Sequence, residues 1–291
     1  MENLRPLRED DAEAVAELYR EAFGDDRVVD AEEVRGWVSN PELQSDWMWV
    51  LEIGGRVVGY GDTWIDRGEM AVELAAPGHW STFFDRFEER ARADGVSPVR
   101  VFVPQGHELV SILADRGYRY WRSAYTMQIG FDEEAPSLPV IPDGFEFRDF
   151  QPSDTDVVRA ALNEAFEGDP VFHEATPGHF QAFYLSERGF DPSLWVLASV
   201  GDQLAGFILS FSERSGDKEL GWVQALGVLP PWRRCGLGDA LLRTAFHRMH
   251  ARGLRRVGLG VDASNETNAL RLYEGAGMRI LNQSDSWVLD V

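Results

Sequence analysis

The sequence has little cysteine, little lysine and no long apolar run. Cys235 is the single cysteine among 291 residues, so no disulfide can form within the chain, and a reducing, cytoplasmic location is expected. Lysine occurs once, at Lys218, and the net charge is −21. Because a nucleic-acid binder presents a basic face, this balance argues against nucleic acid as a partner. Apolar runs are short, and the N-terminus carries no apolar leader, so no membrane segment is expected.

The composition is that of a folded protein with about two domains. Hydrophobic residues make up 44% of the chain and include ten Trp and seventeen Phe, which is enough for a sizeable core. The segment 132–144 holds three prolines, four acidic residues and a glycine, a composition typical of a linker. We therefore expect an N-terminal domain over 1–131 and a C-terminal domain over 145–291.

The two halves repeat the same order of elements. Leu4–Phe23 and Phe145–Phe166 each have the pattern of a short strand, an acidic turn and an amphipathic helix ending in Glu-Ala-Phe. Trp49–Ile65 and Trp195–Phe211 each have the pattern of a hairpin with glycine at the turn. The order in each half is strand, one or two helices, hairpin, strand, helix, strand, helix and closing strand. This order predicts a mixed α/β fold that occurs twice.

A glycine-rich turn between a strand and a helix is the most informative feature of the C-terminal half. Gly221–Leu229 has the pattern of a buried strand, and two prolines end it. The letters RRCGLG follow, and apolar residues then recur at helical spacing up to Gly253, which predicts a helix that starts near Gly236. Free amides at a helix N-terminus attract anions, and glycines let a phosphate approach the backbone. A tight turn without a ligand is the simpler alternative.

Two common phosphate-binding motifs do not fit this turn. A P-loop requires a lysine and a serine or threonine after its second glycine, where Asp239 and Ala240 stand. A dinucleotide fingerprint requires a third glycine at the position of Leu241 and a ribose-binding acid downstream. Both motifs are therefore excluded by residue type.

The turn resembles the R/Q-x-x-G-x-G/A signature of the GCN5-related N-acetyltransferase (GNAT) family. The stretch Val257–Ile280 resembles the strand, N-x-x-A-x-x-L-Y-x-x-x-G-F/M helix and strand that follow in that family. Its matching residues have the family's order and spacing: Asn265, Ala269, Leu272, Tyr273, Gly277 and Met278. The close resemblance covers Gly221–Ile280, and a weaker one extends over both halves. It implies an α/β fold of two tandem GNAT-like domains, each a mixed, mostly antiparallel sheet flanked by helices.

The resemblance implies a site for acetyl-CoA in the C-terminal domain. In the family, the amides of the signature bind the pyrophosphate, and the preceding strand diverges from its neighbour so that pantetheine lies against its exposed backbone. Carried over residue by residue, the site consists of Leu226, Gly227, Val228, Arg233, Arg234, Cys235, Gly236, Leu237, Gly238 and Asp239. Cys235 occupies a variable position of the signature and is interpreted as a bystander thiol. No metal is expected.

Two residues of the second motif have implied roles. Tyr273 matches the family tyrosine whose hydroxyl lies near the CoA sulfur, where a phenol can act as an acid toward the leaving thiolate. Core packing is the alternative role of this side chain. Asn265 matches a position that contacts the cofactor, but an asparagine before ETNALRLY also suits a helix cap.

The usual general base is missing. Many members of the family carry a glutamate on the strand before the turn, where this chain has Trp222, Gln224 and Ala225. Glu219 and Asp217 lie just upstream and could act through water, and we expect Glu219 to serve. Otherwise the amine arrives neutral or loses its proton to ordered water.

Acceptor contacts are expected from the strand and from one loop. Trp222 and Gln224 lie on the strand before the turn. The loop Glu167–Phe180 holds Glu167, Asp169 and His173 beside aromatic residues, and its acids would suit a cationic amine. A solvated loop with no such role is the alternative.

The N-terminal half lacks the motif residues. Aligning Gly78 with Gly236 places Trp80 where Gly238 stands, and Trp80 would then block the approach of a phosphate. Leu113 stands where the C-terminal half has its tyrosine. This half is therefore interpreted as a degenerate domain that braces the active one.

Together these features predict an acetyl-CoA-dependent N-acetyltransferase that acts on a small-molecule amine by direct attack in a ternary complex. One alternative is a non-catalytic acyl-CoA-binding or regulatory protein that kept the turn and lost turnover. Another is a transferase that uses a longer acyl-CoA. The sequence does not predict the oligomeric state.

Overall fold

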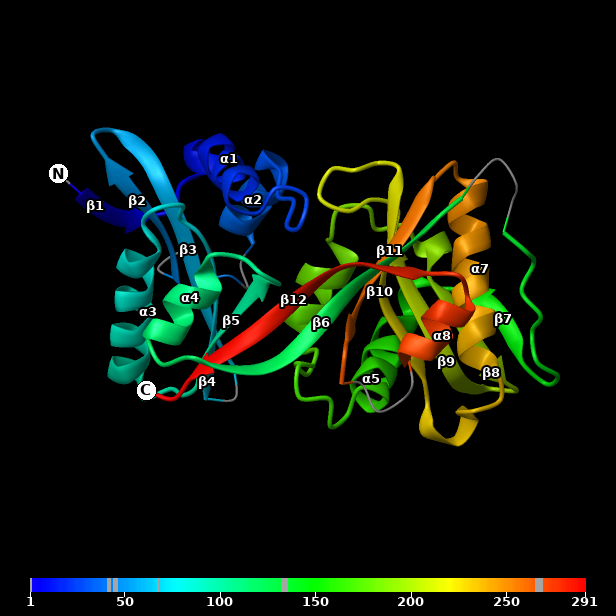
Figure 1. Ribbon diagram of the computed structural model, residues 1–291. Coiled ribbons are helices and arrows are strands. Elements are labelled where there is room, and N and C mark those ends of the chain that lie inside the picture. The colour runs from blue at the N-terminus through cyan, green and yellow to red at the C-terminus, as the bar shows by residue number, and fades with distance from the viewer. Residues whose placement is uncertain (1, 41–42, 44–46, 67, 132–135, 265–268) are drawn as a thin grey trace. The chain divides into compact units, whose positions relative to one another are not determined.

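The computed structural model describes residues 2–40, 43, 47–66, 68–131, 136–264 and 269–291 (Figure 1). The chain divides into two compact units. Unit 1 consists of residues 1–125, 262–264 and 282–291, and unit 2 consists of residues 126–261 and 265–281. The strands β6 (Arg119–Gly130) and β12 (Arg279–Leu289) therefore supply residues to both units, and β11 (Arg256–Asp262) gives its last residue to unit 1. Within the described residues, no helix is both long enough and apolar enough to cross a membrane.

Unit 1 is a mixed sheet with helices packed on it. Its strands lie in the order β1-β2-β3-β4-β5-β12, and neighbouring pairs are antiparallel except β4–β5. The first five strands are β1 (Glu2–Pro6), β2 (Met48–Ile53), β3 (Arg56–Asp66), β4 (Glu69–Ala75) and β5 (Val99–Pro104). The helices are η1 (Glu9–Asp11), α1 (Ala12–Phe23), α2 (Ala31–Ser39), α3 (Trp80–Asp94) and α4 (Leu109–Asp115).

The side chains of β3 alternate between two core layers of unit 1. Gly59 and Gly61 face α3, and a Cβ on them would lie 2.7 and 2.6 Å from the ring of Phe83. Glycine therefore lets α3 pack directly on the strand. Tyr60, between them, is fully buried in the layer that includes α1. Because side chains alternate along the strand, one aromatic layer packs against α1 and α2 and the other against α3 and α4.

A group of charged and aromatic side chains lies in the layer under α1. Asp62 accepts a hydrogen bond from the Tyr60 hydroxyl at 2.6 Å and stands opposite Glu73 across the β3–β4 pair. Arg27 pairs with Glu73 at 2.9 Å, and its guanidinium lies 5.6 Å from the ring centre of Tyr19. Burial raises the pKa of Asp62 to about 7, and the Glu73 carboxylate contributes to the shift.

This raised pKa predicts that the protein loses stability as the pH rises through the weakly acidic range. The folded state holds a proton on Asp62 that the unfolded chain releases near pH 3.8, so the free energy of unfolding falls between about pH 4 and about pH 7. One such group contributes a slope of at most about 1.4 kcal/mol per pH unit. Asp62→Asn should remove this contribution and stabilise the protein at pH 8.

Denaturant unfolding at several pH values between 5 and 8 measures this effect. Asp115→Asn, at an exposed position of α4, is the matched control and should follow the wild type. An Asp62→Asn variant with the same pH slope as the wild type would show that the buried carboxyl is not the cause.

Unit 2 has the same plan. Its strands lie in the order β6-β11-β10-β9-β8-β7, with β10–β11 parallel and β7–β8, β8–β9 and β9–β10 antiparallel. The strands besides β6 are β7 (Glu146–Asp149), β8 (Val196–Val200), β9 (Gln203–Phe211), β10 (Leu220–Val228) and β11 (Arg256–Asp262). The helices are α5 (Thr155–Ala165), α6 (Pro177–Phe180), α7 (Leu237–Ala251) and α8 (Ala269–Gly275). Short helical turns are η3 (Pro152–Asp154), η4 (Gln181–Leu185), η5 (Pro192–Leu194) and η6 (Pro230–Trp232).

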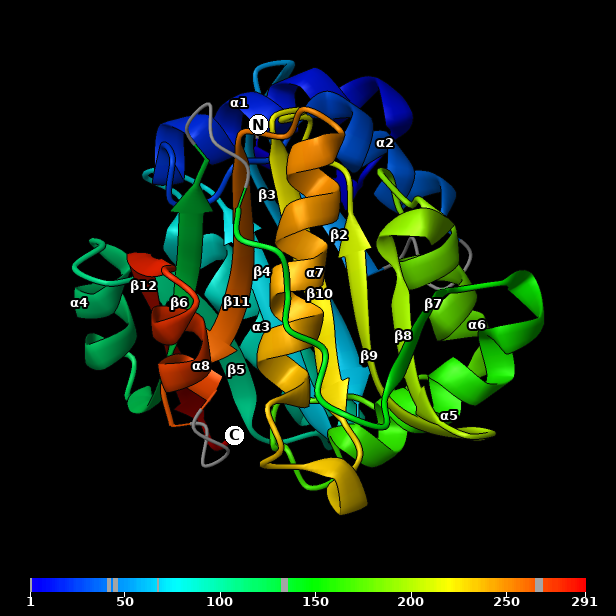
Figure 2. The same cartoon turned by 90° about the vertical axis from the view of Figure 1, so that its right-hand side faces the viewer.

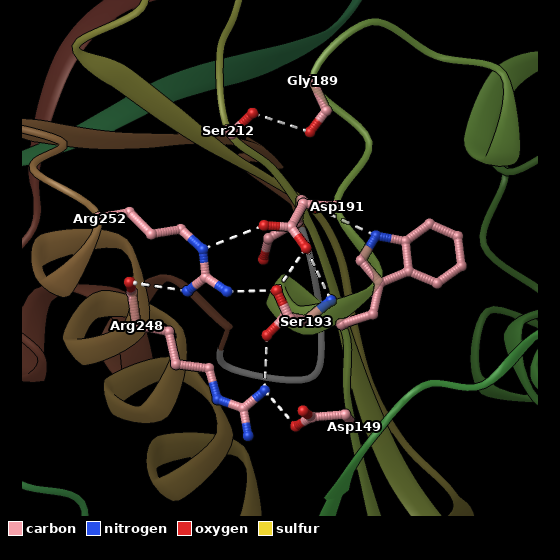
Figure 3. A network of polar contacts seen from close by, with 9 residues as sticks. Asp149, Gly189, Asp191, Ser193, Ser212, Arg248 and Arg252 are labelled. Atoms are coloured by element: carbon pink, nitrogen blue, oxygen red, sulfur yellow. Dashed lines mark hydrogen bonds and ion pairs between the residues drawn. The ribbon is translucent and has the colours of Figure 1, made fainter.

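The helix α7 lies across the sheet of unit 2 (Figure 2). A polar network fixes its C-terminal end. Arg248 pairs with Asp149 of β7 at 2.6 Å and donates to the carbonyl of Ser193 at 2.7 Å. Arg252 pairs with Asp191 at 3.0 Å. Figure 3 shows both guanidinium groups directed at these partners. Because the C-terminal end of α7 is held in this way, the direction of its N-terminus is fixed as well.

The predicted fold class and order of elements are confirmed. The predicted domain boundaries stay a prediction, and the compact units differ from them at three places: residues 126–131 belong to unit 2, and residues 262–264 and 282–291 belong to unit 1. The last of these is the longest. The physical reason is strand pairing, since Ser284–Leu289 of β12 runs antiparallel to Val99–Pro104 of β5. Of the predicted linker, residues 136–144 contain neither helix nor strand, and residues 132–135 lie outside the described residues.

Candidate active site

The strand β10 separates from one neighbour halfway along its length. It pairs with β9 up to Val228, whereas its described pairs with β11 end at Val223. The register against β9 shifts between Val223 and Ala225, which makes Gln224 a bulge residue. From Gln224 to Val228 the edge that faces β11 therefore has no partner strand among the described residues, and its backbone can bind an extended ligand. The predicted cofactor residues Leu226, Gly227 and Val228 lie in this stretch.

The turn after β10 presents a row of unpartnered amides. The short turn η6 leads into Arg234 and Gly236, which have left-handed backbone with φ of 67° and 85°. The six amides from Arg234 to Asp239 have no acceptor within the described part of the chain, and the first helical bond runs from Ala240 to the carbonyl of Gly236. Free amides at the start of a helix form an anion site. The predicted phosphate turn thus has the geometry that phosphate binding requires.

The two arginines of the turn have different surroundings. Arg233 donates from Nε to the carbonyl of Val228 at 2.9 Å and from Nη2 to the carbonyl of Ala165 at 3.1 Å. Its guanidinium is thus committed to the backbone. Arg234 is exposed, and its guanidinium has neither a hydrogen bond nor an ion pair with any described residue. Of these two predicted cofactor contacts, Arg234 is the one whose side chain is available to a phosphate.

The other predicted turn residues contribute mainly backbone. Asp239 pairs with Arg243 at 2.8 Å, which offsets a negative charge that would repel a phosphate. Cys235 is exposed, and its thiol donates to the carbonyl of Trp232 at 2.9 Å. Leu237 is buried and anchors the start of α7. The turn is therefore held by contacts that leave its amides open.

The helix α8, which carries Tyr273, packs next to this turn. A Cβ on Gly238 would lie 3.3 Å from Cδ2 of Leu272, so the glycine permits close packing of α8. Arg243 of α7 donates to the carbonyl of Gly275 at 3.1 Å. Tyr273 is 8% exposed, and burial raises its pKa to about 12, so its hydroxyl keeps a proton at neutral pH. The predicted contact Asn265 lies outside the described residues.

The predicted acceptor residues of β10 have neutral or cationic neighbours. The ring of Trp222 covers Gly258, and the guanidinium of Arg214 lies 4.9 Å from its centre. Gln224 is exposed and forms a side-chain hydrogen bond with Tyr184. Burial raises the pKa of Tyr184 to about 12. Neither a carboxamide nor a neutral phenol removes a proton from an ammonium group, so this pair provides no general base.

The loop after α5 begins beside the end of β10. A Cβ on Gly227 would lie 3.0 Å from the Cβ of Ala165, the last residue of α5. In the loop, Asp169 accepts from the amide of Val171 at 2.9 Å. The predicted acceptor residues have different exposures: Glu167 is exposed, whereas Asp169 and His173 are half-buried. Their contact with an acceptor stays a prediction.

Glu219 lies at the opposite end of β10 from the turn. It directly precedes the strand, and the turn follows Val228. A strand rises about 3.3 Å per residue, which puts the two ends of β10 roughly 30 Å apart. Its side chain is exposed, and its carbonyl accepts from the amides of Arg255 and Arg256. The structure does not bring Glu219 to Tyr273, and its role as the base stays a prediction without geometric support.

Three neighbours of the site are missed by sequence analysis: Tyr184, Arg214 and Arg243. The ring of Tyr184 stacks on that of Phe180, with 4.9 Å between the ring centres. The two residues are four positions apart in the sequence, and core residues of a helix have the same spacing, so the sequence does not mark Tyr184 as a site residue. Arg214 comes close to Trp222 only in the folded chain, and no local pattern in the sequence indicates this contact. Arg243 is predictable from the sequence, because a basic residue four positions after Asp239 on the same helix is placed to form an ion pair with it.

The corresponding turn of unit 1 is different. Trp80 is buried, and its indole donates to the carboxylate of Glu108 at 2.7 Å. A cavity of about 340 Å³ lies at the start of α3 and is lined by Gly78, His79, Trp80, Ser81, Thr82, Glu108 and Ile112. Trp80 thus forms one wall of this cavity. The Glu108 carboxylate disfavours a phosphate there, and the absence of a cofactor site in this half stays a prediction.

Comparison with known proteins gives one consistent family. Residues 157–278 match the acetyltransferase (GNAT) family. A mycothiol acetyltransferase of Salinispora tropica is 31% identical over 276 residues, which cover 92% of this chain and 88% of the relative. A GCN5-related N-acetyltransferase structure from Sphaerobacter thermophilus is 28% identical, with a TM-score of 0.79 over 99% of this chain and 95% of that chain. The chain therefore belongs to the acetyltransferase (GNAT) family.

The tandem arrangement also has a structural counterpart. A tandem GNAT protein from the clavulanic acid biosynthesis pathway is 16% identical and shares the fold, with a TM-score of 0.73 over 100% of this chain and 98% of that chain. The predicted resemblance to the tandem members of the family is confirmed.

The protein is an acetyl-CoA-dependent N-acetyltransferase, as the two motifs predicted. Neither the non-catalytic alternative nor the longer acyl donor is favoured by these relatives. Among the residues that the structure describes, no three His, Cys, Asp or Glu side chains gather as a metal site would require. Independence from metal stays a prediction.

Proposed function

We propose that this enzyme acetylates the amine of a small molecule by direct attack within a ternary complex. The mycothiol acetyltransferase relatives support a small acceptor. The observation that carries the cofactor site is the row of unpartnered amides from Arg234 to Asp239, next to the unpaired edge of β10. These amides suit the pyrophosphate of acetyl-CoA, and the edge from Leu226 to Val228 suits the amides of pantetheine.

The reaction joins the amine nitrogen to the acetyl carbonyl carbon and releases coenzyme A. An amide of the unpaired stretch of β10 donates to the carbonyl oxygen as negative charge develops there. When the carbon–sulfur bond breaks, the Tyr273 hydroxyl donates its proton to the sulfur and is reprotonated from solvent. Alignment of the two reactants alone can lower the barrier by about 7–11 kcal/mol in well-oriented reactions.

The acceptor amine reacts in its neutral form, and its proton passes to water. The support for this step is the pair at the bulge, since Gln224 and Tyr184 cannot accept the proton. The carboxylates of Glu167 and Asp169, in the loop after α5, attract the acceptor while its amine is still protonated and cationic.

Arg234 allows a test of the turn that separates stability from binding. Its left-handed backbone is unfavourable for a non-glycine residue by about 1–2 kcal/mol. Arg234→Gly and Arg234→Asn should therefore keep or raise the melting temperature and weaken acetyl-CoA binding about tenfold through loss of the charged contact. Arg234→Lys, which keeps the charge, should bind within about threefold of the wild type. Wild-type affinity in the glycine variant would remove Arg234 from the phosphate site.

Turnover itself is tested with the full-length protein and [acetyl-¹⁴C]acetyl-CoA against a panel of amino acids, amino sugars, aminoglycosides and polyamines. We expect radiolabel to transfer to at least one small amine and to remain absent from protein acceptors such as histone tails. Transfer to a protein amine alone would contradict the small-molecule acceptor and leave the family assignment intact.

A further inference from the structure

Arg233 is the first arginine of the turn, and its side chain points away from the phosphate site. Its guanidinium donates to the carbonyl of Val228 at 2.9 Å and to that of Ala165 at 3.1 Å. A guanidinium donates through a rigid planar fork, so these two bonds fix its plane. This single side chain therefore joins the last residue of β10 to the last residue of α5.

Ala165 is where the loop after α5 begins. The last carbonyls of a helix have no partner within the helix, and Arg233 satisfies this one. At its other end the loop is closed on the same helix. The Oδ1 atom of Asn163 accepts from the amide of Ala175 at 2.9 Å, and its Nδ2 atom donates to the carbonyl of Ala175 at 3.3 Å. Residues 166–176, between α5 and α6, thus form a loop that Ala175 closes on α5, with Arg233 at the end beside the turn.

The backbone on the other side of Arg233 is the row of free amides. The unpartnered amides begin at the next residue, Arg234, whose backbone is left-handed. An anion that binds these amides restrains the turn, and Arg233 is covalently part of it. A restraint on the turn therefore reaches Ala165 through the Arg233 side chain and one hydrogen bond.

We infer that Arg233 is a positioning residue that couples the cofactor turn to the loop 166–176, so that binding of the cofactor orders the loop that receives the acceptor. This inference rests on the proposed function, because it requires that acetyl-CoA binds at the turn. Coupling of this kind is reciprocal, so an acceptor in the loop strengthens cofactor binding by the same factor.

Hydrogen exchange measured by mass spectrometry tests the coupling without knowledge of the acceptor. The full-length protein is compared with and without saturating coenzyme A. In the wild type we expect coenzyme A to slow exchange at residues 234–240. We also expect it to slow exchange at least threefold at residues 166–176. In Arg233→Gln we expect protection at 234–240 to remain and the ligand-induced change at 166–176 to disappear.

Two further variants separate coupling from simple damage. Arg234→Gln removes the neighbouring charge but not the bonds to Val228 and Ala165, so at saturating coenzyme A its loop should be protected as in the wild type. Arg233→Lys can donate to one of the two carbonyls and should restore part of the loop response. A merely structural arginine would change exchange in the loop equally with and without ligand.

The outcomes distinguish the two claims. The coupling would be overturned, and the proposed function spared, if coenzyme A protected the turn of the wild type and left exchange in its loop unchanged. A loop response in Arg233→Gln equal to that of the wild type would have the same meaning. Absence of protection at both segments would overturn the cofactor site at the turn and the coupling with it.

Discussion

Tyr273→Phe should lower kcat by about 10²–10³-fold and leave the dissociation constant of acetyl-CoA within about twofold of the wild type. The substitution removes one hydroxyl and preserves the packing of a side chain that is 8% exposed. Binding energy at the turn comes from amides that are untouched by this change. The leaving thiolate, in contrast, loses its proton donor.

The pH dependence gives a second signature of the same residue. Burial raises the pKa of Tyr273 to about 12, so the acid stays protonated throughout the neutral range. The wild-type rate should therefore show no decline from ionisation of this group up to about pH 10. Tyr118→Phe, at a buried tyrosine of unit 1, is the matched control and should keep wild-type kcat. Unchanged kcat in Tyr273→Phe would assign the tyrosine to packing alone.

Deletion of residues 282–291 should unfold unit 1. In unit 1, Ser284–Leu289 of β12 is hydrogen bonded to Val99–Pro104, Val288 is buried, and Trp287 and Leu289 pack against the core. Removing three such side chains loses roughly 5 kcal/mol, which is comparable with the whole stability of many proteins. The amides of β5 should then exchange with solvent at rates near those of an unfolded chain.

Deletion of Asp290 and Val291 alone is the control for this experiment. It removes an exposed ion pair with Arg119, the core contact of the half-buried Val291 and its hydrogen bond to Ser97, but no part of β12, so the loss should stay within about 2 kcal/mol. If β5 remains protected after the longer deletion, unit 1 folds without its last strand, and the predicted boundary at residue 131 would describe an independent domain.

The phosphate turn was largely predictable because its signals are local. Gly221–Leu229 was predicted as a strand and β10 covers Leu220–Val228, and the helix expected near Gly236 begins at Leu237. Glycine at a left-handed position, prolines after a strand and apolar residues at helical spacing all act within a few residues. The position of Tyr273 was predictable for the same reason, because the residue belongs to a motif on a single helix.

The remaining features depend on contacts that are distant in the sequence. The pattern of Arg279–Leu289 indicates a strand, but its partner β5 lies far away along the chain. The bulge at Gln224 is a property of a pair of strands, and the sequence of β10 alone contains no sign of it. Arg233 was predicted to contact the cofactor, and its bonds to two carbonyls could not be foreseen because one of them belongs to α5.

The central claim is that the turn of the C-terminal half is the one acetyl-CoA site of the chain. Isothermal titration calorimetry of acetyl-CoA into wild type, Gly236→Trp and Gly201→Trp tests it most directly. Both glycines have positive φ, but Gly201 lies in the exposed β8–β9 turn, where an added Cβ would have nothing within 4 Å. We predict one site per chain, lost in Gly236→Trp and kept in Gly201→Trp. Two sites per chain, or binding that survives in Gly236→Trp, would contradict the account.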